Sequence, residues 1–98
     1  MKVLFSDPVR IEAQDSADYL DLECEGLGQV FEQNAQRVAD LISRYPEAAA
    51  QERPGIHRIL LHKFPYKLIY SIEGDTILIL AVAHQHREPN YWVDRQSK

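Results

Sequence analysis

Near the middle of this chain, the spacing of apolar residues changes from that of a helix to that of a strand. Up to Tyr45 the apolar side chains recur every three or four positions, as on one face of an α-helix. From Ile56 onward they form three runs rich in isoleucine, leucine, valine and tyrosine, which are typical of strands. The sequence therefore predicts an α+β fold with helices first and a sheet second.

The first half predicts a short strand followed by two helices. Residues 2–5 precede a Ser-Asp-Pro sequence at 6–8 that suits a helix cap and the first helical position. Gly26 and Gly28 interrupt the helical pattern, so we expect two helices joined by a tight turn and packed as an antiparallel hairpin. The first apolar stripe comprises Val9, Ala13, Ala17, Leu20 and Cys24, and the second comprises Leu27, Phe31, Ala35, Val38, Ile42 and Tyr45.

The second half predicts three consecutive antiparallel strands at 56–63, 66–73 and 76–84. A Gly-Asp pair at 74–75 links the last two runs, and glycine supplies the positive φ that tight hairpin turns need. We expect the stretch 46–55 to be a loop with at most one helical turn, because it ends in Pro-Gly.

The tail is expected to fold back onto the sheet. The strand at 76–84 is apolar on both faces from Ile77 to Ala83, so both faces should be covered. Tyr91 and Trp92 are costly to leave in water, and Pro89 can open a short helical turn through Asp94 and Arg95 that buries them. The predicted order is βααβββ: an N-terminal helical hairpin packed on an antiparallel sheet, with a short C-terminal tail, in a single domain of residues 1–98.

Composition predicts a cytoplasmic protein. No apolar run approaches the ~20 residues of a membrane-spanning helix, no export signal is visible, and the single cysteine excludes an intrachain disulfide. The net charge of −4 is unevenly distributed: residues 1–50 hold four basic and ten acidic residues, whereas residues 51–98 hold seven and five. Of the acidic residues, we expect Glu12, Asp15, Asp18 and Asp21 to lie mostly away from the buried stripe of the first helix.

Three kinds of active centre find little support. His84 and His86 share one side of an extended chain, but the sequence offers no third metal ligand at a plausible spacing, so we predict no metal. Cys24 lies on the apolar stripe of an acidic helix, where burial and carboxylates disfavour a reactive thiolate. The four glycines are scattered, so no phosphate-binding loop is present and no cofactor is expected.

A basic and aromatic set is expected to converge where the predicted strands end. Such a cluster can hold phosphates, and a basic group with a tyrosine can assist attack by an RNA 2′-hydroxyl. The alternative is an ordinary solvated sheet face. The set comprises Arg58, His62, Lys67, His84, His86, Arg87 and Tyr91.

The run from Phe64 to His84, followed by Arg87, Pro89, Tyr91 and Trp92, resembles the RelE/ParE superfamily of bacterial type II toxins. In that family an aromatic-basic-aliphatic-aliphatic-tyrosine strand meets a Glu-Gly-Asp type hairpin, and an apolar strand then leads into an arginine-containing tail. The Arg-Pro-Gly sequence at 53–55 and the helix pair extend the resemblance over nearly the whole chain.

The resemblance implies a toxin that forms a hetero-oligomer with a cognate antitoxin, with no membrane partner. ParE-like members inhibit DNA gyrase, RelE-like members cleave messenger RNA on the ribosome, and an inactive antitoxin-binding relative is a third alternative. In the nuclease case Arg58, Lys67, Arg87 and Tyr91 would be catalytic. Leu60 and Gln85, however, stand where that branch usually has basic residues. The net acidity also disfavours RNA as the target, so we predict a ParE-like toxin.

Two surfaces are predicted to contact partners. The first is the acidic outer face of the helical hairpin. The second comprises Lys67, His84, His86, Arg87, Tyr91 and Trp92. For the antitoxin, the apolar sheet face and the groove beside the helices are the expected receptor.

Overall fold

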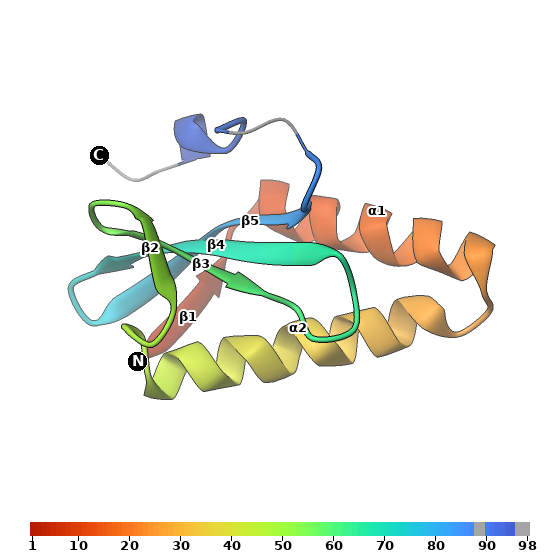
Figure 1. Cartoon of the computed structure of the whole chain (residues 1–98), viewed down its shortest axis with the longest axis horizontal. Coiled ribbons are helices and arrows are strands. Elements are labelled where there is room, and N and C mark those ends of the chain that lie inside the picture. The colour runs from red at the N-terminus through yellow and green to blue at the C-terminus, as the bar shows by residue number, and fades with distance from the viewer. Residues whose placement is uncertain (88–89, 96–98) are drawn as a thin grey trace.

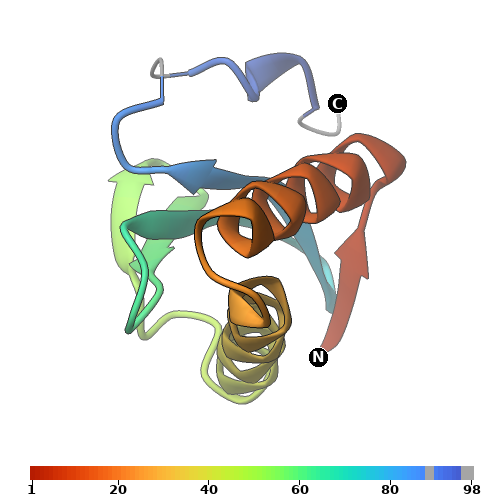
Figure 2. The ribbon, with the colours of Figure 1, turned by 90° about the vertical axis from the view of Figure 1, so that its right-hand side faces the viewer.

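The computed structural model describes residues 1–87 and 90–95 and has three layers (Figures 1 and 2). A helical layer covers one face of a five-stranded sheet, and the C-terminal tail crosses the other face. The elements are β1 (Lys2–Phe5), α1 (Asp7–Glu23), α2 (Leu27–Arg44), β2 (Ala50–Arg53), β3 (Ile56–Leu60), β4 (Tyr66–Glu73), β5 (Thr76–His84) and the 3₁₀ helix η1 (Val93–Arg95). The predicted α+β class with its helical hairpin is confirmed.

The sheet has the order β1-β5-β4-β3-β2. Strands β3, β4 and β5 pair antiparallel, as the hairpin signal predicted, and Gly74 has a φ of 65° in the turn between the last two. At one edge, however, β1 pairs with β5 in parallel, so the sheet is mixed rather than wholly antiparallel.

One strand was not predicted, and the end of another differs from the prediction. The predicted loop at 46–55 contains β2, whose four residues are all exposed; it pairs with β3 across a turn in which Gly55 has a φ of 77°. Strand β3 ends at Leu60 rather than at Lys63, because the chain turns and the Leu61 N–H donates to the Tyr66 carbonyl. The order is therefore βααββββ with a tail.

The two helices touch closely at Gly28. A Cβ atom at this position would lie 2.4 Å from the Ala17 carbonyl oxygen, so only glycine fits. The Gly28 N–H also donates to Asp21 Oδ1 at 2.8 Å, which satisfies a donor of the first turn of α2 from the neighbouring helix. Gly26, with a φ of 86°, makes the turn between the helices.

The main core lies between the helices and the sheet. Phe31 of α2 meets the rings of Phe64 and Tyr66 edge-on at 5.4 and 4.9 Å, which fixes the hairpin over β4. Both predicted helical stripes contribute to this core, except at their ends. Cys24 is exposed because the backbone leaves the helix there in an extended conformation, and Tyr45 is 60% exposed.

A second core lies on the opposite face of the sheet, under the tail. Trp92 is only 1% exposed and packs with Ile69, Leu80 and Ala81, so the predicted return of the tail onto the sheet is confirmed. The 3₁₀ turn is shorter than predicted, and Pro89 lies outside the described residues. Strand β5 is thus covered on both faces, as its apolar sequence requires.

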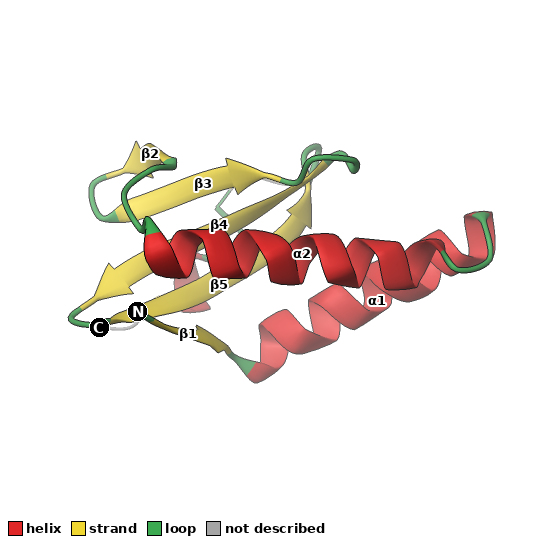
Figure 3. Cartoon of the chain, turned by 90° about the horizontal axis from the view of Figure 1, so that it is seen from below, coloured by secondary structure: helices red, strands yellow, loops and turns green. Residues whose placement is uncertain are grey.

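The far half of the helical hairpin projects beyond the sheet, as Figures 1 and 3 show. Neither described helix has the length and apolar character that crossing a membrane would require. The outer faces of the far half of this hairpin are therefore not covered by the sheet.

Candidate functional site

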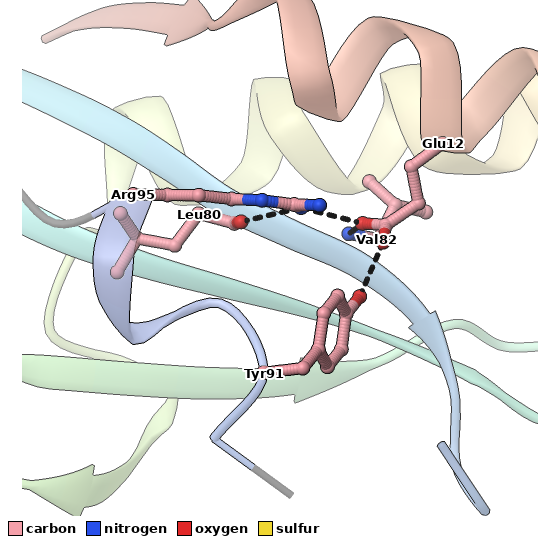
Figure 4. A network of polar contacts seen from close by, with 5 residues as sticks. All are labelled: Glu12, Leu80, Val82, Tyr91 and Arg95. Atoms are coloured by element: carbon pink, nitrogen blue, oxygen red, sulfur yellow. Dashed lines mark hydrogen bonds and ion pairs between the residues drawn. The ribbon is translucent and has the colours of Figure 1, made fainter. Parts of the chain in front are cut away.

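A single carboxylate, that of Glu12, joins α1, β5 and the tail (Figure 4). Its Oε1 accepts hydrogen bonds from the Val82 N–H at 2.9 Å and from Arg95 Nη1 at 3.1 Å, and its Oε2 accepts one from the Tyr91 hydroxyl. Arg95 Nη1 also donates to the Leu80 carbonyl at 3.2 Å. The tail is therefore tied to both the first helix and the last strand.

The shape of β5 explains why these backbone groups need side-chain partners. The β1–β5 ladder ends at Phe5↔Ile79, so the rest of β5 has no strand on that side within the described chain. In addition, Ile69 pairs with Ala81 while Tyr70 pairs with Ile79, which leaves Leu80 as the extra residue of a β-bulge. Buried backbone groups that lack a ladder partner must be satisfied in another way, and Glu12 and Arg95 do so.

The environment of Tyr91 keeps its hydroxyl protonated. Burial and the hydrogen bond to Glu12 raise the pKa of Tyr91 well above its ordinary value, although the neighbouring Arg87 and Arg95 oppose the shift. Both guanidinium groups lie over the Tyr91 ring: the distance from Cζ to the ring centroid is 4.1 Å for Arg87 and 5.1 Å for Arg95. Tyr91 is thus a fixed donor and a platform for Arg87.

Beside this network lies an open pocket of about 420 Å³ between α1, β5 and the tail. Its α1 wall includes Ile11 and Tyr19, which are 62% and 57% exposed, and its other wall includes His84 and Arg87. The pocket is mixed in charge, because its lining includes the carboxylates of Glu12 and Asp15 as well as the guanidinium groups of Arg87 and Arg95. Such a surface suits recognition of a polar or amphipathic partner.

The structure brings four of the predicted site residues together at this pocket. His84 and Arg87 line it, and Tyr91 supports the Arg87 guanidinium. The His86 ring lies 5.3 Å from that of His84, and the His86 N–H donates to His84 Nδ1 at 3.1 Å. Among residues 1–87 and 90–95, no group of three or more histidine, cysteine or acidic residues could hold a metal ion.

Arg58, Lys67 and His62 do not line this pocket. Arg58 and Lys67 pair with Ile69 and Ala83, which belong to the core under the tail, so both side chains lie on the tail side. His84 instead pairs with Tyr66, which belongs to the helix-side core. The predicted cluster is therefore divided, because Arg58, Lys67 and Tyr91 lie on the tail side of the sheet, whereas His84 lies on the helix side.

Further differences concern Lys67, His62 and Trp92. Lys67 Nζ lies 3.9 Å from Glu52 Oε1 of β2, so its charge already has a partner. His62 lies at the other edge of the sheet, beside α2. Trp92 serves as core under the tail and, at 1% exposure, offers almost no surface to a partner.

Sequence reasoning missed Glu12 and Arg95. Glu12 was expected on an outer face of α1, but its side chain is only 11% exposed. A usable signal was present: Glu12 follows Val9 by three positions and precedes Ala17 by five, so it lies at the border of the buried stripe. A carboxylate that becomes buried at such a border needs a hydrogen-bond donor from the protein.

Comparison with known proteins supports the fold. A solved structure described as "Chromosomal ParDE TA system from P. aeruginosa" contains a chain that superimposes with a TM-score of 0.64 at 14% identity, covering 86% of this chain and 95% of that chain. This chain has the fold of that ParDE chain. The fold implied by the RelE/ParE resemblance is thereby confirmed. No protein-family model and no curated protein sequence matches the chain.

Proposed function

We propose that the chain is the toxin of a bacterial toxin–antitoxin pair, that a cognate antitoxin neutralises it, and that it inhibits DNA gyrase by binding. The observation that carries this proposal is the fold shared with a ParDE chain over 86% of the present chain. The sequence motif at 64–84 and the arginine-containing tail point to the same group of proteins.

The geometry favours binding over RNA cleavage. Of the residues that a nuclease would use, Arg58 and Lys67 do not line the pocket to which Arg87 contributes, and Lys67 Nζ already lies 3.9 Å from Glu52 Oε1. A general base accepts a proton from the reacting group, so it must be deprotonated near the working pH. Tyr91 is the opposite case, since its raised pKa keeps the hydroxyl protonated and directed at Glu12.

Charge supports the same choice. Proteins that act on RNA gain affinity by replacing counterions at several phosphates, and this chain carries a net charge of −4. At a position where the nuclease branch usually has a basic residue, the chain has Leu60, whose side chain is 59% exposed and apolar. Both features suit a protein target better than a phosphate backbone.

For the target, we propose the pocket surface formed by His84, His86 and Arg87, with Tyr91 as its support. Arginine stacked on an aromatic ring is held in one orientation, and such pairs are frequent at the energetic centres of interfaces. The cytoplasm, where gyrase is found, is the proposed location.

The proposal is tested by expressing the chain from a tightly controlled promoter, alone and with the product of the gene adjacent to it. We expect growth arrest in the first case and normal growth in the second. Arg87→Ala should weaken the arrest, whereas Asp75→Ala, in the exposed hairpin turn at the other end of β5, should not. If the chain alone leaves growth unchanged, the toxin proposal is wrong.

Messenger RNA from the arrested cells identifies the target class. We expect transcripts to remain intact while DNA damage from trapped gyrase accumulates. Cuts within translated transcripts would instead assign the chain to the ribosome-dependent nucleases. If expression of the chain leaves growth unchanged but the chain binds the adjacent gene product tightly, the chain is an inactive relative that only binds antitoxin.

A further inference from the structure

The α1–β5 pocket contains one cation that the fold holds in place without neutralising it. Arg87 and Arg95 both line the pocket, and both lie over the Tyr91 ring. The protein itself engages Arg95, whose Nη1 donates to Glu12 Oε1 at 3.1 Å and to the Leu80 carbonyl at 3.2 Å. Arg87 is exposed and forms no ion pair with any carboxylate in the described part of the chain. Its charge is therefore available to a partner.

The position of Arg87 is fixed at its backbone and at its guanidinium group. Its backbone N–H donates to the His84 carbonyl at 2.9 Å, which closes a turn directly after β5. Its Cζ lies 4.1 Å from the centroid of the Tyr91 ring, and the Tyr91 hydroxyl donates to Glu12. A ring face holds a cation without using a hydrogen-bond acceptor, so the guanidinium donors stay available to a carboxylate, which can accept two of them. Arg87 is thus a preorganised receptor for a carboxylate.

The α1 wall of the same pocket offers exposed apolar surface. Ile11 and Tyr19 line the pocket and are 62% and 57% exposed. They are eight positions apart, so they belong to one i, i+4, i+8 row of the helix. Exposed apolar side chains gathered beside polar groups are characteristic of interaction sites. An occupant that places a carboxylate at Arg87 can therefore bury an apolar side chain against this wall.

The other charges of the pocket favour a peptide over a nucleic acid as the occupant. Asp15 stands between Ile11 and Tyr19 in the same helical row, is exposed and lines the pocket. Its carboxylate can accept the backbone N–H groups of a peptide, whereas it repels phosphates. Glu12 adds a second carboxylate to the lining. One acidic side chain at Arg87 is compatible with this distribution of charge, and a run of phosphates is not.

From these features we infer that the α1–β5 pocket recognises a peptide segment of the target in which an acidic side chain stands beside an apolar one. Arg87 binds the carboxylate, and the apolar side chain packs against Ile11 and Tyr19. The inference rests on the proposed function, which assigns target binding to this pocket, and it adds the chemistry of the recognised segment and the role of the α1 wall.

Two short peptides that differ in one group test this chemistry in the absence of a target protein. Both are acetylated and amidated peptides of sequence Gly-Leu-X-Leu-Gly, with either glutamate or glutamine at X. Binding to the purified chain is followed by NMR, through the side-chain signals of Arg87 and Ile11. We expect the glutamate peptide to bind roughly two- to fivefold more tightly, which is the range for one exposed ion pair.

This preference for glutamate should disappear in Arg87→Ala. Arg10→Ala is the matched control and should keep it, because Arg10 is an exposed arginine of α1 that does not line the pocket. Equal affinity for the two peptides, a preference that survives in Arg87→Ala, or no binding of either peptide at millimolar concentration would overturn the inference.

A thymidine trinucleotide serves as the phosphate probe in the same titration. At physiological ionic strength we expect it to bind more weakly than the glutamate peptide, because Asp15 and Glu12 lie in the pocket lining. If the trinucleotide binds more tightly than the glutamate peptide, the occupant is a nucleic acid and the inference is wrong.

Ile11→Asn tests the apolar wall separately from the cation. It removes apolar contact surface but leaves Arg87 in place, so both peptides should bind roughly threefold or more weakly while the preference for glutamate remains. Unchanged affinity for both peptides in this variant would contradict the assigned role of α1.

A supercoiling assay with purified gyrase separates this inference from the proposed function. Arg87→Glu, shown to be folded by circular dichroism, should fail to block supercoiling, whereas Arg87→Lys keeps the charge and should retain a weakened block. If Arg87→Glu blocks gyrase as well as the wild-type chain does, the inference is wrong and the proposed function stands. If the wild-type chain leaves gyrase unaffected but prefers the glutamate peptide through Arg87, the proposed target is wrong and the chemistry of the pocket stands.

Discussion

Replacement of Glu12 by alanine should release the tail and destabilise the whole domain. Three donors lose their acceptor in this variant: the Val82 N–H, the Tyr91 hydroxyl and the Arg95 guanidinium. A buried donor left without a partner costs about 1–3 kcal/mol. Arg95 is 22% exposed and retains the Leu80 carbonyl, so water offsets part of the loss.

We therefore expect the free energy of unfolding to fall by about 2–3 kcal/mol. For a domain of this length, each kcal/mol changes Tm by roughly 4–8 °C, so Tm should fall by roughly 10–20 °C. Asp15→Ala is the control, because Asp15 is an exposed carboxylate one turn further along the same helix. It should change Tm by no more than a few degrees.

Trp92 provides a direct readout of the tail, because it is the only tryptophan and is 1% exposed. In Glu12→Ala, its fluorescence should shift to longer wavelength and become accessible to acrylamide well below Tm. If the emission and Tm of this variant match those of Asp15→Ala, then Glu12 does not anchor the tail and the reasoning is refuted.

Two other perturbations test separate parts of the fold. Gly28→Ala forces a Cβ against the Ala17 carbonyl, so it should lower the free energy of unfolding by about 2 kcal/mol or more, measured by urea denaturation; stability equal to wild type would contradict the tight helix contact. The folded pKa of Tyr91 lies above its unfolded value, so its contribution to stability is complete below about pH 10 and is lost as pH rises beyond it. Stability should therefore fall above about pH 10 and fall less steeply in Tyr91→Phe; an equal slope in both proteins would contradict the assigned environment.

The elements with strong local signals were predictable. The paired helices followed from two apolar stripes broken at Gly26, and β4 and β5 followed from long apolar runs joined by a tight turn. Each of these signals depends only on residues within the element and its immediate flanks, so tertiary contacts were not needed to interpret them.

The elements that depend on distant partners were not predictable. The four residues of β2 are exposed and contain no β-branched side chain, and the strand exists because a turn places it beside β3. The parallel pairing of β1 joins segments more than seventy positions apart, and nothing in Lys2–Phe5 alone specifies its neighbour or direction.

The candidate site was predicted in part for the same reason. The sequence identified Arg87 and Tyr91, and the Arg87 Cζ lies 4.1 Å from the centroid of the Tyr91 ring, but it grouped His84 with Arg58 and Lys67, which lie on the opposite face of the sheet from His84. The bulge at Leu80 determines which residues of β5 face each side, and its position cannot be read from a continuous apolar run.

The proposal that this chain inhibits gyrase by binding is tested most directly with purified components. Supercoiling of relaxed plasmid by gyrase should be blocked when the chain is added, with cleaved gyrase–DNA complexes trapped, and should recover when the adjacent gene product is present in excess. Unimpaired supercoiling, together with chain-dependent cutting of messenger RNA on translating ribosomes, would contradict the account.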